Sequence, residues 1–515
     1  MTKGLLRSTA VVGQMTLISR ILGFVRDVVI ARVFGASLAA DAFFVAFKIP
    51  NLFRRLFAEG AFAQAFVPVL AEYRERREPA AVGELIGATA ATLAVVLTAF
   101  VALGVIAAPI FIMVFAPGFI GEVDKLELAA ALLRLTFPYL LLISLTALAG
   151  AVLNTFGRFA VPALTPALLN IALIGCALGL APRLDEPVLA LAVGVLVGGV
   201  AQLAVQLAAL ARLGLNVRLV VSFAHTGVRR ILRLMGPAIF GVSVAQINLL
   251  LDTVIASFLV TGSISWLYYA DRLVEFPLGV FGLALATVIL PVLSTRHSEG
   301  STERFSATLD WALRWVLLIG TPAALALAIL AVPTLSTLFQ YGELGQHDVA
   351  MSARSLVAYS GGLVAFMLIK ILAPGFYARQ DTRTPVRIGI IAMGANMVLN
   401  LILVFPLAHA GLALATTLSA CLNAALLWRG LVVAGVCRVQ AGWWRFVLQV
   451  ACANLVMGAV LLGWLEPLAV WSSWDGRERA VQLASGIALG ALVYFCMLAL
   501  SGVRPRHMSM REPGV

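Results

Sequence analysis

Apolar runs of about twenty residues recur from one end of the chain to the other, and short polar stretches separate them. A helix needs about that length to cross the ~30 Å hydrocarbon layer of a bilayer. The pattern therefore predicts an all-α polytopic membrane protein with about fourteen transmembrane helices. The predicted spans are 8–34, 39–70, 84–115, 126–153, 160–181, 187–212, 229–260, 265–294, 308–339, 350–376, 385–406, 411–435, 445–465 and 480–502.

The composition leads to the same class of protein. Of the 515 residues, 61% are hydrophobic and only 12% are charged, and the mean hydropathy is +1.00. A soluble domain carries roughly 25% charged residues, which it needs to cover its surface. The composition therefore excludes a soluble protein of this length.

The basic residues are unevenly distributed between the loops. One set of alternate loops holds most of the arginines, for example in 74–77, 229–233 and 504–511. The opposite set holds only Lys125, Arg183, Arg477 and Arg479. Cytoplasmic loops are enriched in lysine and arginine, so the bias predicts that both termini are cytoplasmic. It also accounts for the net charge of +12 without a nucleic-acid partner.

Motifs for nucleotide or metal chemistry are missing from the sequence. It contains no GxxxxGK[ST] loop and no HExxH pair. The loops are too short for a nucleotide-binding domain, and the five cysteines lie singly in apolar segments (Cys176, Cys421, Cys437, Cys452 and Cys496). We therefore expect no cofactor, no metal site and no disulfide framework, and transport energy from an ion gradient, the membrane potential or a partner.

An internal repeat divides the chain. FVPVL ending at Leu70 matches VILPVL ending at Leu293, an offset of 223 residues, and GRFAVP ending at Pro162 meets DTRTP ending at Pro385 at the same offset. Many secondary transporters are built from such repeats around a central site. The repeat predicts an N-terminal lobe at 1–225, a C-terminal lobe at 226–440, and two additional helices with a cytoplasmic tail at 441–515.

Several predicted spans contain charged residues. They include Arg20, Arg26, Asp27, Asp41, Lys48, Arg54, Arg55, Glu59, Asp252, Asp271, Arg272 and Glu275. Each charge facing lipid at mid-depth costs about 2.5–3.5 kcal/mol. The eight on the first two helices would together cost about 20 kcal/mol, which exceeds the stability of a typical fold. These side chains must therefore line a wet cavity or pair with one another.

The spacing of these charges on the second helix forms a stripe. At 100° per residue, Asp41, Lys48 and Arg55 drift slowly around the helix, and Glu59 returns to the direction of Asp41. Pro50 is expected to kink this helix. We expect the stripe to line a cavity between the two lobes. The alternative is structural pairing, such as Arg26 with Asp27. Arginine suits phosphate and carboxylate, so the sequence points to an anionic, phosphorylated substrate.

Four segments carry a family resemblance that covers the whole chain. SRILGFVRD, ADAFFVAFKIPNLFRRLFAEGAFAQAFVPVL, YYADRLVEFPLGVFGLALATVILP and FYARQDTRTPV resemble the MurJ/MviN lipid II flippases of the multidrug/oligosaccharidyl-lipid/polysaccharide exporter superfamily. The resemblance implies transport of undecaprenyl-pyrophosphate disaccharide-pentapeptide (lipid II) from the inner to the outer leaflet of the bacterial inner membrane, for peptidoglycan and cell wall biogenesis and cell shape.

The resemblance also implies roles for particular residues. Arg20, Arg26, Arg54 and Arg272 correspond to the arginines that bind substrate in an alternating-access cavity. The gating or charge-pairing residues would be Asp27, Asp41, Lys48, Arg55, Glu59, Asp271 and Glu275. Some relatives bind sodium through helices 7 and 11, where Asp252 and Asp381 are loosely matched candidates. Coupling would use Na+, H+ or the membrane potential, and partners would be membrane lipids and the peptidoglycan synthesis machinery.

Three other functions fit the pattern less closely. A cation-coupled drug exporter of the same superfamily needs carboxylates in an apolar cavity, whereas this chain has at least as many arginines there. A flippase for another polyprenyl-pyrophosphate glycan would share the same physical logic with a different head group. A scaffold of the division machinery would not need a long, costly polar stripe.

Overall fold

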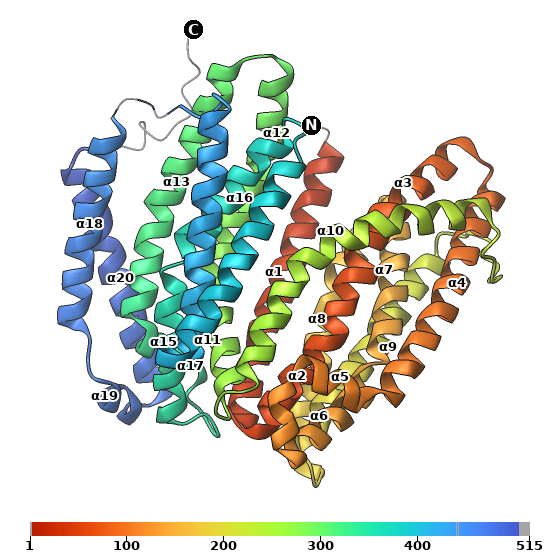
Figure 1. Ribbon diagram of the computed structural model, residues 1–515, viewed down its shortest axis with the longest axis horizontal. Coiled ribbons are helices and arrows are strands. Elements are labelled where there is room, and N and C mark those ends of the chain that lie inside the picture. Colours follow the sequence, from red (N-terminus) through yellow and green to blue (C-terminus); the bar gives the residue numbers. More distant parts are fainter. Residues whose placement is uncertain (1–2, 439, 441, 504–515) are drawn as a thin grey trace. The chain divides into compact units, whose positions relative to one another are not determined.

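The computed structural model describes residues 3–438, 440 and 442–503. Side chains are described in this part except at 3–12, 57–59, 61, 238, 240–245, 247–249, 283 and 284. The residues form two compact units, Met1–Ser265 and Trp266–Val515, and both are helical (Figure 1). The all-α prediction is confirmed.

The first unit contains ten α-helices and three short helical turns among the described residues. They are α1 (Lys3–Phe34), α2 (Leu38–Arg54), the π-helical turn η1 (Arg55–Gly60), α3 (Ala61–Arg76), α4 (Pro79–Ile106), α5 (Ala108–Phe115), η2 (Pro117–Gly121), α6 (Val123–Thr136), α7 (Tyr139–Thr155), α8 (Ala160–Gly179), η3 (Ala181–Arg183), α9 (Leu189–Ala211) and α10 (Thr226–Ala256). α11 (Ser263–Pro277) begins just before the unit ends and continues into the second.

The second unit continues with nine further α-helices and one π-helical turn in the described chain. They are η4 (Leu278–Gly282), α12 (Leu283–Ser298), α13 (Thr302–Ile329), α14 (Ala331–Phe339), α15 (Gln346–Ser360), α16 (Leu363–Tyr377), α17 (Arg383–Val433), α18 (Trp443–Trp464), α19 (Leu468–Ser473) and α20 (Gly476–Leu500). α18 and α20 pack together and against the apolar side of α13, where Val450, Met457 and Tyr494 belong to one buried cluster.

The predicted spans coincide with helices to within a few residues at each end. Ten helical segments of the described chain are long and apolar enough to cross a membrane. The predicted spans 8–34, 39–70 and 229–260 are not among these ten, and all three carry intramembrane charges. α17 covers two predicted spans, 385–406 and 411–435, so the ten segments account for eleven of the fourteen predicted spans.

The break inside α17 falls in the predicted gap between those two spans. Ala408 has φ 49° and ψ −129°, outside the helical region, in a conformation that costs a non-glycine residue energy. The chain then folds back so closely that a Cβ atom on Gly411 would lie 2.2 Å from the carbonyl oxygen of Leu403. Glycine at position 411 is therefore required for the turn between the two halves of α17.

The order of helices repeats along the chain with the predicted offset. α4 and α5 begin at residues 79 and 108, and α13 and α14 begin 223 residues later, at 302 and 331. The π-helical turns η1 and η4 begin at residues 55 and 278, which are also 223 apart. The compact units place α10 with the first unit, whereas the repeat begins its second copy there. The division into lobes at 225 and 440 stays a prediction, which this recurrence supports.

Candidate functional site

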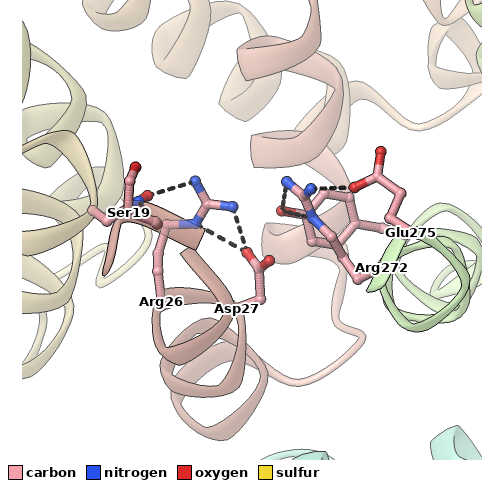
Figure 2. Close-up of polar contacts among 7 residues, drawn as sticks. Ser19, Arg26, Asp27, Arg272 and Glu275 are labelled. Atoms are coloured by element: carbon pink, nitrogen blue, oxygen red, sulfur yellow. Dashed lines mark hydrogen bonds and ion pairs between the residues drawn. The ribbon is translucent and has the colours of Figure 1, made fainter. Parts of the chain in front are cut away.

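An arginine and an aspartate on α1 form a buried pair (Figure 2). The Arg26 guanidinium donates to Asp27 Oδ1 from Nη2 at 2.6 Å and from Nε at 2.9 Å. Its Nη1 donates to Oδ1 of Asn170 on α8 at 3.1 Å, and the Asn170 amide donates to the carbonyl oxygen of Ser19 at 3.1 Å. Asn170 therefore fixes the orientation of Arg26 relative to its own helix.

The predicted polar stripe of α2 reaches along α10. Lys48 Nζ donates to Thr253 Oγ1 at 2.5 Å, and Arg55 Nη1 donates to Gln246 Oε1 at 3.5 Å. At the end of the row, Asp41 contacts the residues that follow α10. As the residue numbers increase from Asp41 to Arg55, the residue numbers of their partners decrease from Gly262 to Gln246. The two segments therefore run antiparallel along this row.

Asp41 forms the most completely buried charged group of this stripe. Its carboxylate accepts from the backbone N–H groups of Gly262 and Ser265 at 2.8 and 3.0 Å and from the Ser265 hydroxyl at 2.6 Å. Lys125 Nζ of α6 lies 3.8 Å from Asp41 Oδ2, and both side chains are 1% exposed. Asp41 thus caps the start of α11 and neutralises a buried lysine.

Lys125 has further partners that fix its position. Its ammonium donates to Thr261 Oγ1 at 3.1 Å and lies 4.5 Å from the ring centre of Phe119, within range of a cation–π interaction. Asp41, Lys125 and the 257–265 segment therefore form one polar cluster, which joins α2, α6 and the connection between α10 and α11.

On α11, Arg272 interacts with residues of its own helix (Figure 2). Its Nη1 donates to Glu275 Oε2 at 2.7 Å, while Nε and Nη2 donate to the Tyr268 hydroxyl at 3.3 and 3.2 Å. The Arg272 side chain is one-third exposed. Asp271, beside it, is also exposed.

The remaining predicted residues occupy diverse surroundings. Arg20 is exposed on α1, and the half-buried Arg54 donates from Nε to Asn51 Oδ1 at 3.1 Å. The Glu59 side chain lies outside the described residues. The 100° spacing that predicts its direction does not hold across η1, where the helix is π-helical.

The two sodium candidates lie on different elements. Asp252 is half-buried on α10. Asp381 accepts from the backbone N–H groups of Arg383 and Thr384 at 3.1 and 3.0 Å, at the start of α17. Hydrogen bonds from the side chain and backbone of Thr384 lower the pKa of the Asp381 carboxyl. No group of three His, Cys, Asp or Glu residues that could hold a metal occurs in the described chain.

Several partners were missed by the sequence reasoning. Lys125 was counted only as a loop cation, although it is fully buried against Asp41. Asn170 and Gln246 are neutral, so an inventory of charges does not find them. An amide within an otherwise apolar span was the available signal for Asn170, because a buried amide needs hydrogen-bond partners.

Comparisons with known proteins cover nearly the whole chain. A family model described as "Lipid II flippase MurJ" matches residues 30–474. A protein of Vibrio cholerae named "Probable lipid II flippase MurJ" is 50% identical over 514 residues, which cover 98% of each chain. A "Lipid II flippase MurJ" of Burkholderia cenocepacia is 44% identical over 515 residues, covering 98% of this chain and 99% of its own.

Solved structures show the same fold. A structure titled "Lipid II flippase MurJ, inward closed conformation" matches with a TM-score of 0.78 at 26% identity, covering 95% of this chain and 98% of its own. An inward-facing MATE multidrug transporter matches with a TM-score of 0.68 at 15% identity, covering 83% of this chain and 98% of its own; that likeness concerns the fold alone. From the family model and the full-length relatives, this chain belongs to the MurJ family of lipid II flippases.

Proposed function

We propose that this chain moves lipid II from the inner to the outer leaflet of the bacterial cytoplasmic membrane for peptidoglycan assembly. As a member of this family, it is a transporter and not an enzyme. The observation that carries the proposal is 50% identity over 98% of the chain to a protein named as a probable lipid II flippase. The arginines held inside predicted spans give this function a chemical basis.

The arginines provide recognition of the phosphates. The guanidinium is planar, keeps its charge at any relevant pH, and can donate two parallel hydrogen bonds to a phosphate. We assign substrate binding to Arg20, Arg26, Arg54 and Arg272. In Arg26, the contacts with Asp27 and Asn170 keep the guanidinium oriented before substrate arrives, which lowers the ordering cost of binding.

The acidic neighbours serve as alternative partners for these cations. In this proposal Asp27 and Glu275 pair with Arg26 and Arg272 while no pyrophosphate is bound. Asp41, Lys48, Arg55, Glu59 and Asp271 contribute to gates that open on alternate sides. Exchange of a carboxylate for a phosphate leaves each arginine with an anionic partner throughout, so no arginine is buried unpaired.

The orientation follows from the basic loops. We propose that both termini face the cytoplasm, because the predicted alternation of spans puts the basic loops 74–77 and 229–233 on the same side of the membrane as both ends of the chain. A single cysteine placed at Arg76, in a background without the native cysteines, should resist an impermeant thiol reagent added to intact cells. A cysteine at Asp185, on the opposite side, should react. The reverse labelling pattern would contradict the orientation.

The leaflet in which lipid II is accessible tests the transport function. Cells depleted of other flippases and supplied with this chain should expose lipid II to an external enzyme that cleaves its head group. Cells with the Arg26→Ala variant should retain it in the inner leaflet. If the chain exposed another polyprenyl-pyrophosphate glycan but not lipid II, the alternative function, a flippase for that glycan, would replace this proposal.

A further inference from the structure

Two adjoining cavities lie between α13 and α18 in the second unit. The smaller, of about 210 Å³, is lined by Arg314, Arg445 and Phe446 with residues near the end of α20. The larger, of about 430 Å³, is lined by Leu317, Leu325, Val450 and Leu455 among others. α13 and α18 provide walls to both cavities, so the two form one groove with a polar end and an apolar end (the α13–α18 groove).

Two arginines line the polar end of the groove, and among the described residues only one of them has an acidic partner. Arg314 Nε donates to Asp310 Oδ2 at 2.8 Å, and its guanidinium lies 5.2 and 5.3 Å from the rings of Trp443 and Phe446. The buried Asp310 carboxylate also accepts from the Trp443 indole N–H. Arg445 is exposed, and no ion pair to it occurs among the described residues.

The start of α18 adds to this positive potential. Gly442 is the N-cap residue and no side chain caps this end, so first-turn N–H groups remain available beside Arg445. A helix N-terminus attracts anions through these N–H groups and the helix dipole. Because Arg445 lines a cavity at the same place, the two features can act on one ligand.

The apolar end suits a hydrocarbon chain. Its only polar wall residues, Thr321 and Asn454, are joined by a hydrogen bond of 2.9 Å from the Asn454 amide. A volume of about 430 Å³ lies within the range of ligand sites. The Trp443 ring lies 5.2 Å from the Arg314 guanidinium, and Trp311, Trp315 and Trp444 lie within three residues of Arg314 or Arg445 along the chain. Tryptophan is enriched where helices meet the membrane–water interface.

We propose that the α13–α18 groove binds an anionic glycerophospholipid of the membrane, with its phosphate at Arg314 and Arg445 and an acyl chain along Leu317, Leu325 and Leu455. Charge complementarity selects this occupant. No acidic residue lines the smaller cavity in the described part of the chain, and Asp310, the partner of Arg314, is buried and already accepts from two donors. A cationic choline or ethanolamine group therefore finds no partner among these residues. The proposal does not depend on which lipid the chain transports.

Native mass spectrometry of the purified full chain can test the site. Titration with phosphatidylglycerol and phosphatidylcholine of matched acyl chains should show tighter binding of phosphatidylglycerol. Arg445→Gln should weaken phosphatidylglycerol binding about fivefold, the contribution of one basic residue near a lipid surface, and leave phosphatidylcholine unchanged. Ala451→Trp, which fills the apolar end, should weaken binding of both lipids.

Arg429→Gln is the matched control, because Arg429 is an exposed arginine of α17 that lines neither cavity. If Arg429→Gln and Arg445→Gln weakened phosphatidylglycerol binding equally, the effect would come from the surface charge of the protein and not from the groove, which would overturn the proposal. So would equal affinity for the two phospholipids, or no effect of Ala451→Trp. Displacement of phosphatidylglycerol by undecaprenyl phosphate, with both weakened by Arg445→Gln, would instead make the groove a substrate site and overturn the assignment.

Discussion

Arg26→Ala is expected to abolish growth of bacteria that depend on this chain as their only flippase. Charge-assisted hydrogen bonds contribute about 1.5–3 kcal/mol each, so loss of the guanidinium should slow transport about 10- to 100-fold. Growth should be measured after depletion of the resident flippase, with membrane abundance of the variant measured in parallel. Arg20→Ala, Arg54→Ala and Arg272→Ala should also lose complementation.

The control for this prediction has to remove the charge without unfolding the protein. Arg26→Ala leaves the Asp27 carboxylate, which is 1% exposed, without its main partner. The double variant Arg26→Gln/Asp27→Asn is neutral and keeps the shape of the pair, so it should reach normal abundance and remain inactive. Asn170→Ala, which keeps the Arg26 charge but removes the hydrogen bonds of the amide to Arg26 and to the Ser19 carbonyl, should retain partial transport. Full growth of the double variant at normal abundance would contradict a role for Arg26 in binding substrate.

Asp41→Ala is expected to lower the free energy of unfolding by about 3–5 kcal/mol, because it removes the buried counter-ion of Lys125 and leaves only the half-exposed Glu122 carboxylate, 3.9 Å from the ammonium. It also removes the acceptor for three hydrogen bonds at the start of α11. The thermal midpoint of the detergent-purified protein, compared with wild type, measures the effect. The double variant Asp41→Ala/Lys125→Met should recover much of the loss, since no charge then remains buried.

The matched control is an ion pair at the surface of the same unit. Arg230 on α10 and Glu72 on α3 lie 2.8 Å apart, but their side chains are 53% and 37% exposed. Water screens such a pair, so Glu72→Ala should cost only about 0–1 kcal/mol. If Asp41→Ala and Glu72→Ala shifted the midpoint equally, burial of the Asp41–Lys125 pair would not be the source of its stability.

The helices were predictable from the sequence because the length of an apolar run is a local property. The run from 385 to 435 shows how far this extends: the predicted gap at 407–410 contains Ala408, where the helical dihedrals break. The positions of the recurring elements were predictable for the same reason, since a repeat is visible in residue types alone. How the lobes divide remains a prediction.

The site was predictable only in part, because the hydrogen-bond and ion-pair partners of its residues come from segments that are far away in the sequence. The phase of Asp41, Lys48 and Arg55 on one face followed from helix geometry. That this face meets α10, at Thr253 and Gln246, could not follow from periodicity. Lys125 and Asn170 lie about 80 and 140 residues from the groups they bind, and nothing local to them signals that distance.

The π-helical turn η1 allows one membrane span to serve two purposes. Each such turn accommodates an extra residue, which advances every later side chain by about 100° around the axis. The charged face of α2 therefore does not continue into α3, where Phe62 and Phe66 are buried with Ile231 of α10. Deleting one residue from 55–60 would restore the ordinary α-helical winding. It would rotate α3 by about 100°, so that the apolar face with Phe62 and Phe66 would turn away from its present packing and toward the direction of the charged side chains of α2.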